Sequence, residues 1–494
     1  PKEGEDYYVT CRVGNGEGFS THSRTSFSFA DAEHGGILNW LRPNTQRDFS
    51  YPVSLCNKPI ISHETCQFQI YPDYRELKKY TGVLYPYNLE TFRSRLEENG
   101  LTQQIDEFHN ATGKWAVECY KADMEYCRRT RGFGGYQLLD IKDYPGQGSA
   151  LCGILDAFME TKGLVEPEVF RGWNAPVVPL ALIPSYCFTT DDTLSAEIAV
   201  SNFTEDSYPA VVEWNIETVS STGKPSKRIA EGVFEKIIEQ GALDTAGNIF
   251  LPLASVGEST QIRIVLKCGE YQNSYNLWVY ADTPVELSPA VMVADTLSKE
   301  VEEALLAGRR VLLVPNYKSI ENQSIEGLFT PDYWNYAMFK TISENGNKPV
   351  SPGTLGMLMD PVHPMFASFP TEGHTNWQWW CIALNSRPLI LDPLNKNDFP
   401  IIQTVDNVER NHKLGILMEM RVGDGSLLIC TTDLNGIGQF PEGRAYADAI
   451  RRYVSGNDFN PAFAIDMQQL RNLLYSKTEE RDIQGVQNLT DYNK

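Results

Sequence analysis

Three carboxylates in the first third of the chain stand directly after short apolar runs. Glu64 follows the run Lys58–Ser62 after one intervening residue, and Asp140 follows Gly134–Leu139, with Asp143 three positions later. Side chains at the carboxyl ends of parallel strands share one face, so they can converge on one ligand as acid, base or nucleophile. Carboxylates also end many strands as solvated caps, and from the residues alone that alternative stays open.

The segment between these two runs predicts the element that would connect them. Residues 101–129 carry apolar side chains three and four positions apart, which is typical of a long amphipathic helix. The apolar positions are Ile105, Phe108, Trp115, Cys119, Tyr120, Met124 and Cys127. A strand, a long helix and a second strand form the unit from which parallel sheets are built.

The rest of the chain has two further textures. Residues from about 185 to 285 alternate short runs rich in Thr, Ser, Val and Ile, which predicts a small antiparallel β-sandwich. From about residue 289 an α/β pattern returns, with a helix expected over 298–307 and Gly308 suited to its C-terminal cap. The last 20 residues are polar and are expected to fray.

Several motifs in the first 184 residues resemble the second half of the catalytic barrel of glycoside hydrolase family 2, the β-galactosidase and β-glucuronidase family. The matching stretches are Lys58–Gln67, Tyr71–Glu76, Lys79–Gly82, Gly132–Asp140, Asp143–Gly148 and Ile154–Phe158. They stand in the family's order, and they resemble a branch found in polysaccharide-degrading bacteria.

The resemblance implies a fold and a division into domains. The fold class expected is α/β plus β. Residues 1–184 would be a portion of a (β/α)8 TIM barrel, its C-terminal half, and residues 185–286 an immunoglobulin-like β-sandwich. Residues 287–456 would form an amidotransferase-like, flavodoxin-like α/β accessory domain, and residues 457–494 a C-terminal helix and tail.

The resemblance also implies an activity. Members of this family hydrolyse glycosidic bonds with retention, using one carboxylate as nucleophile and a second carboxyl as acid and then base. Glu64 matches the nucleophile. His63 and Gln67 are expected to contact Glu64 and the substrate, and Asp140 and Asp143 to bind sugar hydroxyls. For Asp143, capping of the following Pro-Gly turn is the alternative, and for His63 the alternative is a side chain that points into the barrel wall.

Two departures from the family pattern matter. The family's acid/base is a Glu that follows an Asn, and no Asn-Glu pair precedes Glu64. We therefore expect the acid/base upstream of this chain, in a missing N-terminal half that is either a separate chain or a truncated segment. The family's Trp under the sugar is also absent from the end of the second strand. Trp40, Tyr71 or Tyr144 would replace it, although ordinary packing explains each of them too.

Two other groups of residues invite a functional reading. The stretch His363–Trp380 holds two His and three Trp, which fits a sugar-stacking or metal-binding surface or, as the alternative, a loop pinned by buried aromatics. His363 and His374 lack the third ligand that zinc requires, so no metal site is predicted. Cys430 follows a strand, where an amidotransferase-like fold would place a nucleophile, but no glycine adjoins it, and a buried inert thiol is the preferred interpretation.

Charge and composition restrict the partners. The 494 residues carry a formal net charge of −21, which disfavours nucleic acid, and no apolar run reaches the length of a membrane span. The leading hypothesis is a retaining β-glycosidase with a carbohydrate substrate and no cofactor. The alternative is a carbohydrate-binding or structural subunit that lacks the acid/base. The resemblance alone implies a periplasmic or secreted bacterial protein, and the sugar and the oligomeric state are not readable.

Overall fold

The structure of the chain is a computed structural model. It describes residue 4 and residues 6–10, 12–13, 19–20, 36–54, 56–145, 149–220, 223–394 and 397–477. These residues form two compact units, each assembled from several segments. Unit 1 comprises the described residues within 1–69, 113–281 and 376–378, and unit 2 comprises those within 70–112, 282–375 and 379–494. The domain boundaries expected from the sequence stay predictions.

Unit 1 begins with a small parallel sheet in the order β1-β4-β5. Its strands are β1 (Tyr8–Thr10), β4 (Ile60–Thr65) and β5 (Phe133–Leu138). Four short elements and one long helix accompany them. The short elements are β2 (Arg12–Val13) and β3 (Phe19–Ser20), which pair with each other, α1 (Ile37–Trp40) and α2 (Ser50–Ser54), and the long helix is α4 (Ile105–Arg128), which belongs to unit 1 from residue 113 onward. The expected strand–helix–strand order is present, and α4 lies inside the predicted helix 101–129.

The prediction of a TIM-barrel portion is wrong. The three parallel strands form an open sheet, and none of the sheets in the described part of the chain closes on itself. Closing an eight-stranded barrel requires each strand to pair with a neighbour on both sides. Here β4 has two neighbours, whereas β1 and β5 are the two edges of their sheet.

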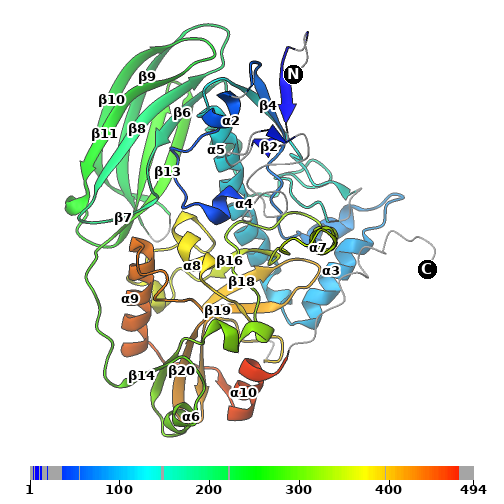
Figure 1. Cartoon of the computed structure of the whole chain (residues 1–494), viewed down its shortest axis with the longest axis vertical. Helices are drawn as coiled ribbons and strands as arrows, with labels where there is room; N and C mark the ends of the chain where they lie inside the picture. Colours follow the sequence, from blue (N-terminus) through cyan, green and yellow to red (C-terminus); the bar gives the residue numbers. More distant parts are fainter. Residues whose placement is uncertain are drawn as a thin grey trace. The chain divides into compact units, whose positions relative to one another are not determined.

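The remainder of unit 1 is built from two β-sheets, drawn in green in Figure 1. A five-stranded sheet has the order β10-β9-β12-β13-β7, and a three-stranded sheet has the order β11-β8-β6. Their strands are β6 (Val177–Leu182), β7 (Cys187–Thr189), β8 (Thr193–Asn202), β9 (Tyr208–Val219), β10 (Pro225–Ile238), β11 (Leu243–Pro252), β12 (Thr260–Cys268) and β13 (Tyr271–Tyr280). The short helix α5 (Pro167–Arg171) precedes them. All pairings are antiparallel except β13 with β7.

Unit 2 is organised around a mixed sheet in the order β14-β15-β20-β19-β18-β16. Its strands are β14 (Val291–Ala294), β15 (Arg310–Leu313), β16 (Thr354–Met359), β17 (Leu389–Ile390), β18 (Ile402–Asp406), β19 (Lys413–Val422), β20 (Gly425–Cys430) and β21 (Ala464–Ile465). Its helices are α3 (Tyr87–Glu98), α6 (Lys299–Leu306), α7 (Tyr336–Asn345), α8 (Trp380–Leu384), α9 (Pro441–Ser455) and α10 (Met467–Tyr475).

This sheet corrects the expected flavodoxin-like domain. A flavodoxin-like sheet is parallel throughout. In unit 2, β14, β15 and β20 are parallel, but β19 runs antiparallel to β20 and to β18, and β18 runs antiparallel to β16. Apolar side chains of α6 and α10, including Leu305 and Leu470, share one buried cluster with Leu313, Met418 and Leu427 of the sheet.

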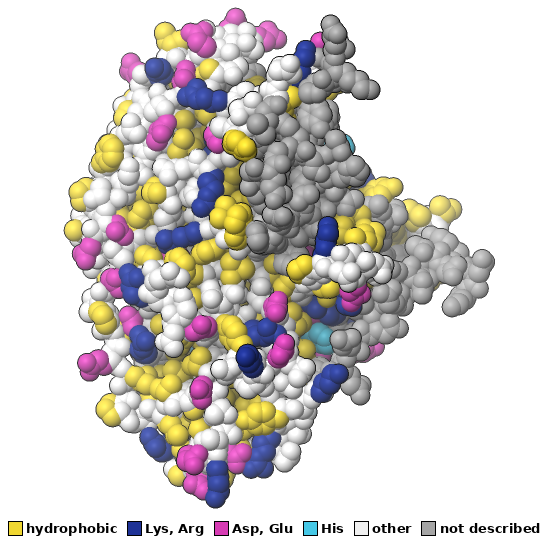
Figure 2. Space-filling model, viewed as in Figure 1, with side chains coloured by type: hydrophobic (Ala, Val, Ile, Leu, Met, Phe, Trp, Pro, Cys, Tyr) yellow, Lys and Arg dark blue, Asp and Glu magenta, His cyan; other side chains and the backbone are white. Residues whose placement is uncertain are grey.

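Two properties of the whole chain follow from the described residues. On the face shown in Figure 2, acidic and basic side chains are interspersed with apolar ones rather than gathered by sign. No helix in the described ranges is both long enough and apolar enough to cross a membrane.

Candidate functional site

The predicted residues lie at the carboxyl-terminal ends of the parallel strands β4 and β5 in the small sheet of unit 1. Ser62 is paired with Tyr136 in the register, and Thr65 with Leu138. The amide of Leu139 donates to the carbonyl of Thr65 at 3.1 Å and extends the pairing past the last strand residue. Because both strands run in the same direction, Glu64 and Asp140 lie at the same, carboxyl-terminal end of the sheet.

Glu64 has an unusual backbone conformation. Its φ of 56° lies in the left-handed region, as does the φ of 70° at Cys66. Residues other than Gly, Asn and Asp rarely adopt such angles unless the surrounding structure enforces them. The Gln67 amide nitrogen donates to the Glu64 carbonyl at 2.9 Å, and the Cys66 amide donates to the Asp123 carboxylate at 3.0 Å. The turn is therefore fixed from two sides, and the Glu64 side chain is half-buried.

Asp123 anchors this turn from α4. Its carboxyl is buried, and burial raises its pKa to about 7, against the opposing effect of the hydrogen bonds from Cys66. The carboxyl lies inside unit 1, so its role here is to hold the backbone that presents Glu64. Residue 123 lies within the helix predicted over 101–129, but the sequence did not single it out.

Gln67 contacts Glu64, through the Glu64 backbone, and His63 has a partner on β5. The His63 Nδ1 lies 2.7 Å from the side-chain oxygen of Gln137 on β5. This contact joins the two strands near their carboxyl-terminal ends. Gln67 is 1% exposed, and its side-chain amide contacts the Glu64 backbone. Gln137 itself is exposed and was not singled out from the sequence. Its position opposite His63 follows from strand register, which the sequence alone does not give.

The two aspartates near β5 have different surroundings. Asp140 is half-buried at the carboxyl-terminal end of the sheet. Asp143 is 2% exposed, and its carboxylate accepts from the Lys162 ammonium at 2.7 Å and from the Gly153 amide at 3.0 Å. Burial raises the pKa of Asp143, and Lys162 opposes that shift. Asp143 is thus engaged by two partners inside unit 1, whereas Asp140 remains within reach of a ligand.

The aromatic residues considered as a sugar platform also differ from one another. Trp40 is 45% exposed and Tyr144 is 48% exposed, as a stacking surface requires. Tyr71 is fully buried in unit 2, where its hydroxyl donates to the Asn411 side chain at 2.5 Å. Tyr71 is therefore a packing residue.

The other constellations from the sequence are largely buried. Trp377 is 6% exposed and Trp379 is fully buried. Cys430 is buried as well, and burial raises the pKa of its thiol to about 11, which keeps it protonated and unreactive at neutral pH. Within the described residues, no group of three or more His, Cys, Asp or Glu side chains is arranged to hold a metal ion.

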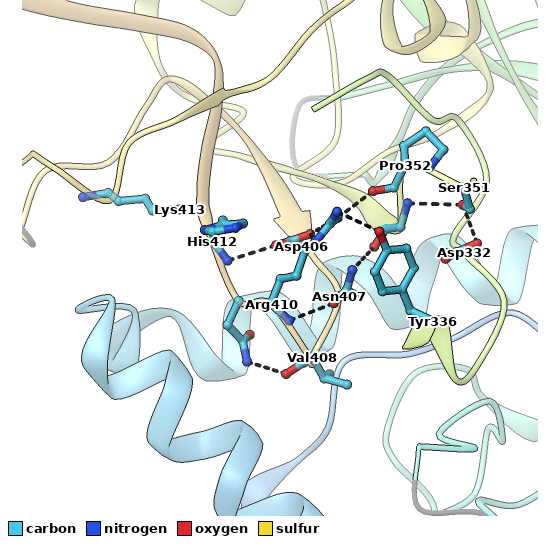
Figure 3. A network of polar contacts seen from close by, with 12 residues as sticks. Asp332, Tyr336, Ser351, Pro352, Asp406, Asn407, Val408, Arg410, His412 and Lys413 are labelled. Atoms are coloured by element: carbon cyan, nitrogen blue, oxygen red, sulfur yellow. Dashed lines mark hydrogen bonds and ion pairs between the residues drawn. The ribbon is translucent and has the colours of Figure 1, made fainter. Parts of the chain in front are cut away.

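Unit 2 contains a buried ionic network that sequence reasoning missed. Arg410 donates to Asp406 at 2.6 Å and to the Tyr336 hydroxyl at 3.1 Å, and its guanidinium lies 4.7 Å from the Tyr336 ring centroid. Asp406 also accepts the His412 amide at 3.0 Å. Figure 3 shows these groups pointing toward one another between β18 and β19. The network holds the connection between the two strands.

Comparison with protein families gives two domains whose function is not known. Residues 292–475 match a family described as a domain of unknown function, DUF8487, and residues 192–281 match a second one, DUF8488. No curated protein matches the chain.

Solved structures resemble only small parts of the chain. A β-glucosidase of saponin metabolism from intestinal bacteria is 16% identical over 18% of this chain and 14% of its own, with a TM-score of 0.16. A Listeria innocua β-glucosidase is 14% identical over 21% and 16%, with a TM-score of 0.17. A Pseudomonas fluorescens alkylpurine DNA glycosylase is 14% identical over 22% and 31%, with a TM-score of 0.18.

Likenesses this weak carry no argument about fold or activity, and they span less than a third of each of those proteins. The comparisons therefore relate residues 192–281 and 292–475 to two domain families of unknown function, and the activity has to be argued from the geometry of the site.

Proposed function

We propose that this chain acts on carbohydrate as a retaining β-glycosidase in which Glu64 is the nucleophile. The observation that carries the proposal is the anchored left-handed conformation of Glu64, with φ at 56°, at the carboxyl end of a parallel strand. Backbone strain of this kind costs about 1–3 kcal/mol and is common where a side chain must be aimed precisely. Glu64 is half-buried.

The neighbouring groups suit the binding of a sugar. Asp140 lies at the same carboxyl-terminal end of the sheet as Glu64, and the His63–Gln137 pair presents an imidazole and an amide at this end. These groups supply donors and acceptors for sugar hydroxyls. In the reaction the Glu64 carboxylate attacks the anomeric carbon and the bond to the leaving oxygen breaks, which forms a glycosyl-enzyme that water hydrolyses.

The proton donor is assigned to a residue outside the part of the chain that the structure describes. A retaining site needs a second carboxyl about 5–5.5 Å from the nucleophile. Asp143 is unsuited to that role because Lys162 and the Gly153 amide engage its carboxylate.

An activated substrate tests the nucleophile without requiring the proton donor. Dinitrophenolate leaves without protonation, so 2,4-dinitrophenyl β-glycosides of galactose, glucuronic acid, mannose and arabinose should report attack by Glu64 alone. We expect turnover of at least one of them, and a loss of about 1,000-fold or more in Glu64→Gln. Glu205→Gln, at an exposed position of unit 1, should keep full activity.

Azide gives the second readout. Glycine adopts a φ of 56° without strain, so Glu64→Gly should fold, and azide should then attack the anomeric carbon in place of the carboxylate. The expected product is a glycosyl azide of inverted configuration. Full activity of Glu64→Gln, or no turnover of any glycoside by the wild type, would refute the proposal.

The alternative is a carbohydrate-binding subunit without hydrolytic activity. The ion pair between Lys162 and Asp143 favours this alternative, because it leaves one carboxylate fewer for catalysis at the carboxyl-terminal end of the sheet. Calorimetric binding of a sugar that is weakened by Asp140→Asn, together with no turnover of any dinitrophenyl glycoside, would support this function instead.

A further inference from the structure

A cavity of about 190 Å³ lies beside β19 in unit 2. Its wall is mostly apolar and includes Leu391, Phe399, Met418, Met420 and Phe463. A cavity of about 150 Å³ holds a molecule of the size of benzene, so this one suits a ligand of roughly six to ten non-hydrogen atoms. Its wall comes from β19 and from the segments that precede β18 and β21.

One carboxylate oxygen in this wall lacks a hydrogen-bond donor within the described part of the chain. The Asp398 Oδ2 atom is buried and has no hydrogen-bond partner among the described residues. Burial also raises the pKa of Asp398, although Lys413 acts in the opposite direction. A buried acceptor without a donor destabilises the folded chain, and an ammonium group of a ligand would supply the missing donor. Glu419, the other acid of the wall, already accepts the Tyr453 hydroxyl at 2.6 Å.

Lys413 brings a cation to the same cavity. It is 2% exposed, and its ammonium lies 4.9 Å from the centroid of the Phe399 ring. Burial lowers its pKa to about 8, against the attraction of Asp398 and Asp392. An anionic group of a ligand would stabilise this desolvated ammonium.

The backbone at Lys413 is fixed independently of the cavity. The Asp392 carboxylate accepts the Lys413 amide at 2.8 Å, and its second oxygen lies 2.6 Å from His412 Nδ1. Figure 3 shows the Lys413 side chain pointing away from the Asp406–Arg410 network. The Lys413 side chain contributes to the wall of the cavity.

We propose that this cavity binds a free α-amino acid with an apolar side chain of about the size of leucine. The ammonium donates to Asp398 Oδ2, the carboxylate accepts from Lys413 Nζ, and the side chain lies against Met418 and Met420. A pyranose fits less well, because hydroxyls surround its ring and most of the wall offers them no partner. The inference concerns unit 2 and does not depend on the glycosidase proposal.

Isothermal titration calorimetry on the full chain tests the ligand class. L-leucine should bind with a Kd of about 1 mM or tighter. Isopentylamine lacks the carboxylate, 4-methylpentanoate lacks the ammonium and glycine lacks the side chain, so each should bind at least about tenfold more weakly than leucine. Glucose should not bind in this cavity.

Variants locate the site. Asp398→Asn and Lys413→Met should each weaken leucine binding about tenfold or more, whereas Asp424→Asn and Lys348→Met, at exposed positions of unit 2, should leave it unchanged. Thermal melts without ligand show whether each variant folds, and Asp398→Asn decides if Lys413→Met does not. No binding at about 10 mM leucine, equal binding of 4-methylpentanoate, or full binding by Asp398→Asn would overturn the proposal.

Discussion

At the scale of single residues, the site in unit 1 is defined by contacts that fix the backbone of Glu64. Asp123, which lies 57 positions after Cys66, accepts a hydrogen bond from the Cys66 amide, and the Gln67 side chain donates one to the carbonyl of Glu64 itself. The identity of Glu64 as a candidate came from the sequence. The conformation that presents it did not, because it depends on a helix residue brought to the turn by the fold.

The pKa of Asp123 gives a prediction about stability. This pKa is about 7 in the folded chain and about 3.9 in the unfolded chain, so the folded state retains a proton that the unfolded state loses. The free energy of unfolding should therefore fall as the pH rises from 4 to 7, by up to about 4 kcal/mol from this group.

Urea unfolding of the wild type and of Asp123→Asn between pH 4 and 8 measures this effect. The asparagine does not titrate, and its side-chain oxygen can still accept from the Cys66 amide. The variant should gain stability relative to the wild type as the pH rises. A difference that stays constant across this range would contradict the raised pKa of Asp123.

At the scale of elements, local patterns predicted what each segment becomes but not how the segments pair. The apolar spacing over 101–129 predicted α4, and the run ending in Leu139 predicted β5. The expected cap at Gly308 is confirmed by its φ of 81° after α6. The parallel pairing of β4 with β5 is confirmed. Closure into a barrel and a flavodoxin-like sheet in unit 2 were predicted wrongly, since an apolar run such as β19 has the same pattern in a parallel and an antiparallel sheet.

Helix α9 offers a test of close packing between elements. Replacing Gly by Ala inside a helix usually stabilises it by about 0.5–1 kcal/mol. At Gly443, however, an added Cβ would lie 2.1 Å from the carbonyl oxygen of Ile437. We expect Gly443→Ala to lower the free energy of unfolding by about 1–3 kcal/mol.

Gly82 provides the matched control, because it has no atom within 4 Å of an added Cβ. Gly82→Ala should change the free energy of unfolding by no more than about 0.5 kcal/mol. Both variants can be compared by urea denaturation. Stabilisation by Gly443→Ala would show that α9 does not pack closely on the segment before it.

At the scale of the whole molecule, charge separates the proposed ligand class from nucleic acid. The net charge of −21 repels phosphates, and on the face in Figure 2 acidic and basic side chains are interspersed. We therefore expect no binding of duplex DNA at low salt, although a DNA glycosylase is among the structures that share a small part with the chain. Fluorescence polarisation with a labelled duplex checks this, and a Kd below about 10 µM would contradict it.

The central claim is that Glu64 forms a covalent bond to a sugar. A 2-deoxy-2-fluoro-β-glycoside with a dinitrophenolate leaving group traps that intermediate, because the fluorine slows the hydrolysis of the glycosyl-enzyme. Peptide mapping of the labelled protein by mass spectrometry should find one fluorosugar on the peptide that contains Glu64, and no label in Glu64→Gln. A label on any other residue, or no label with any of the four sugars, would contradict the account.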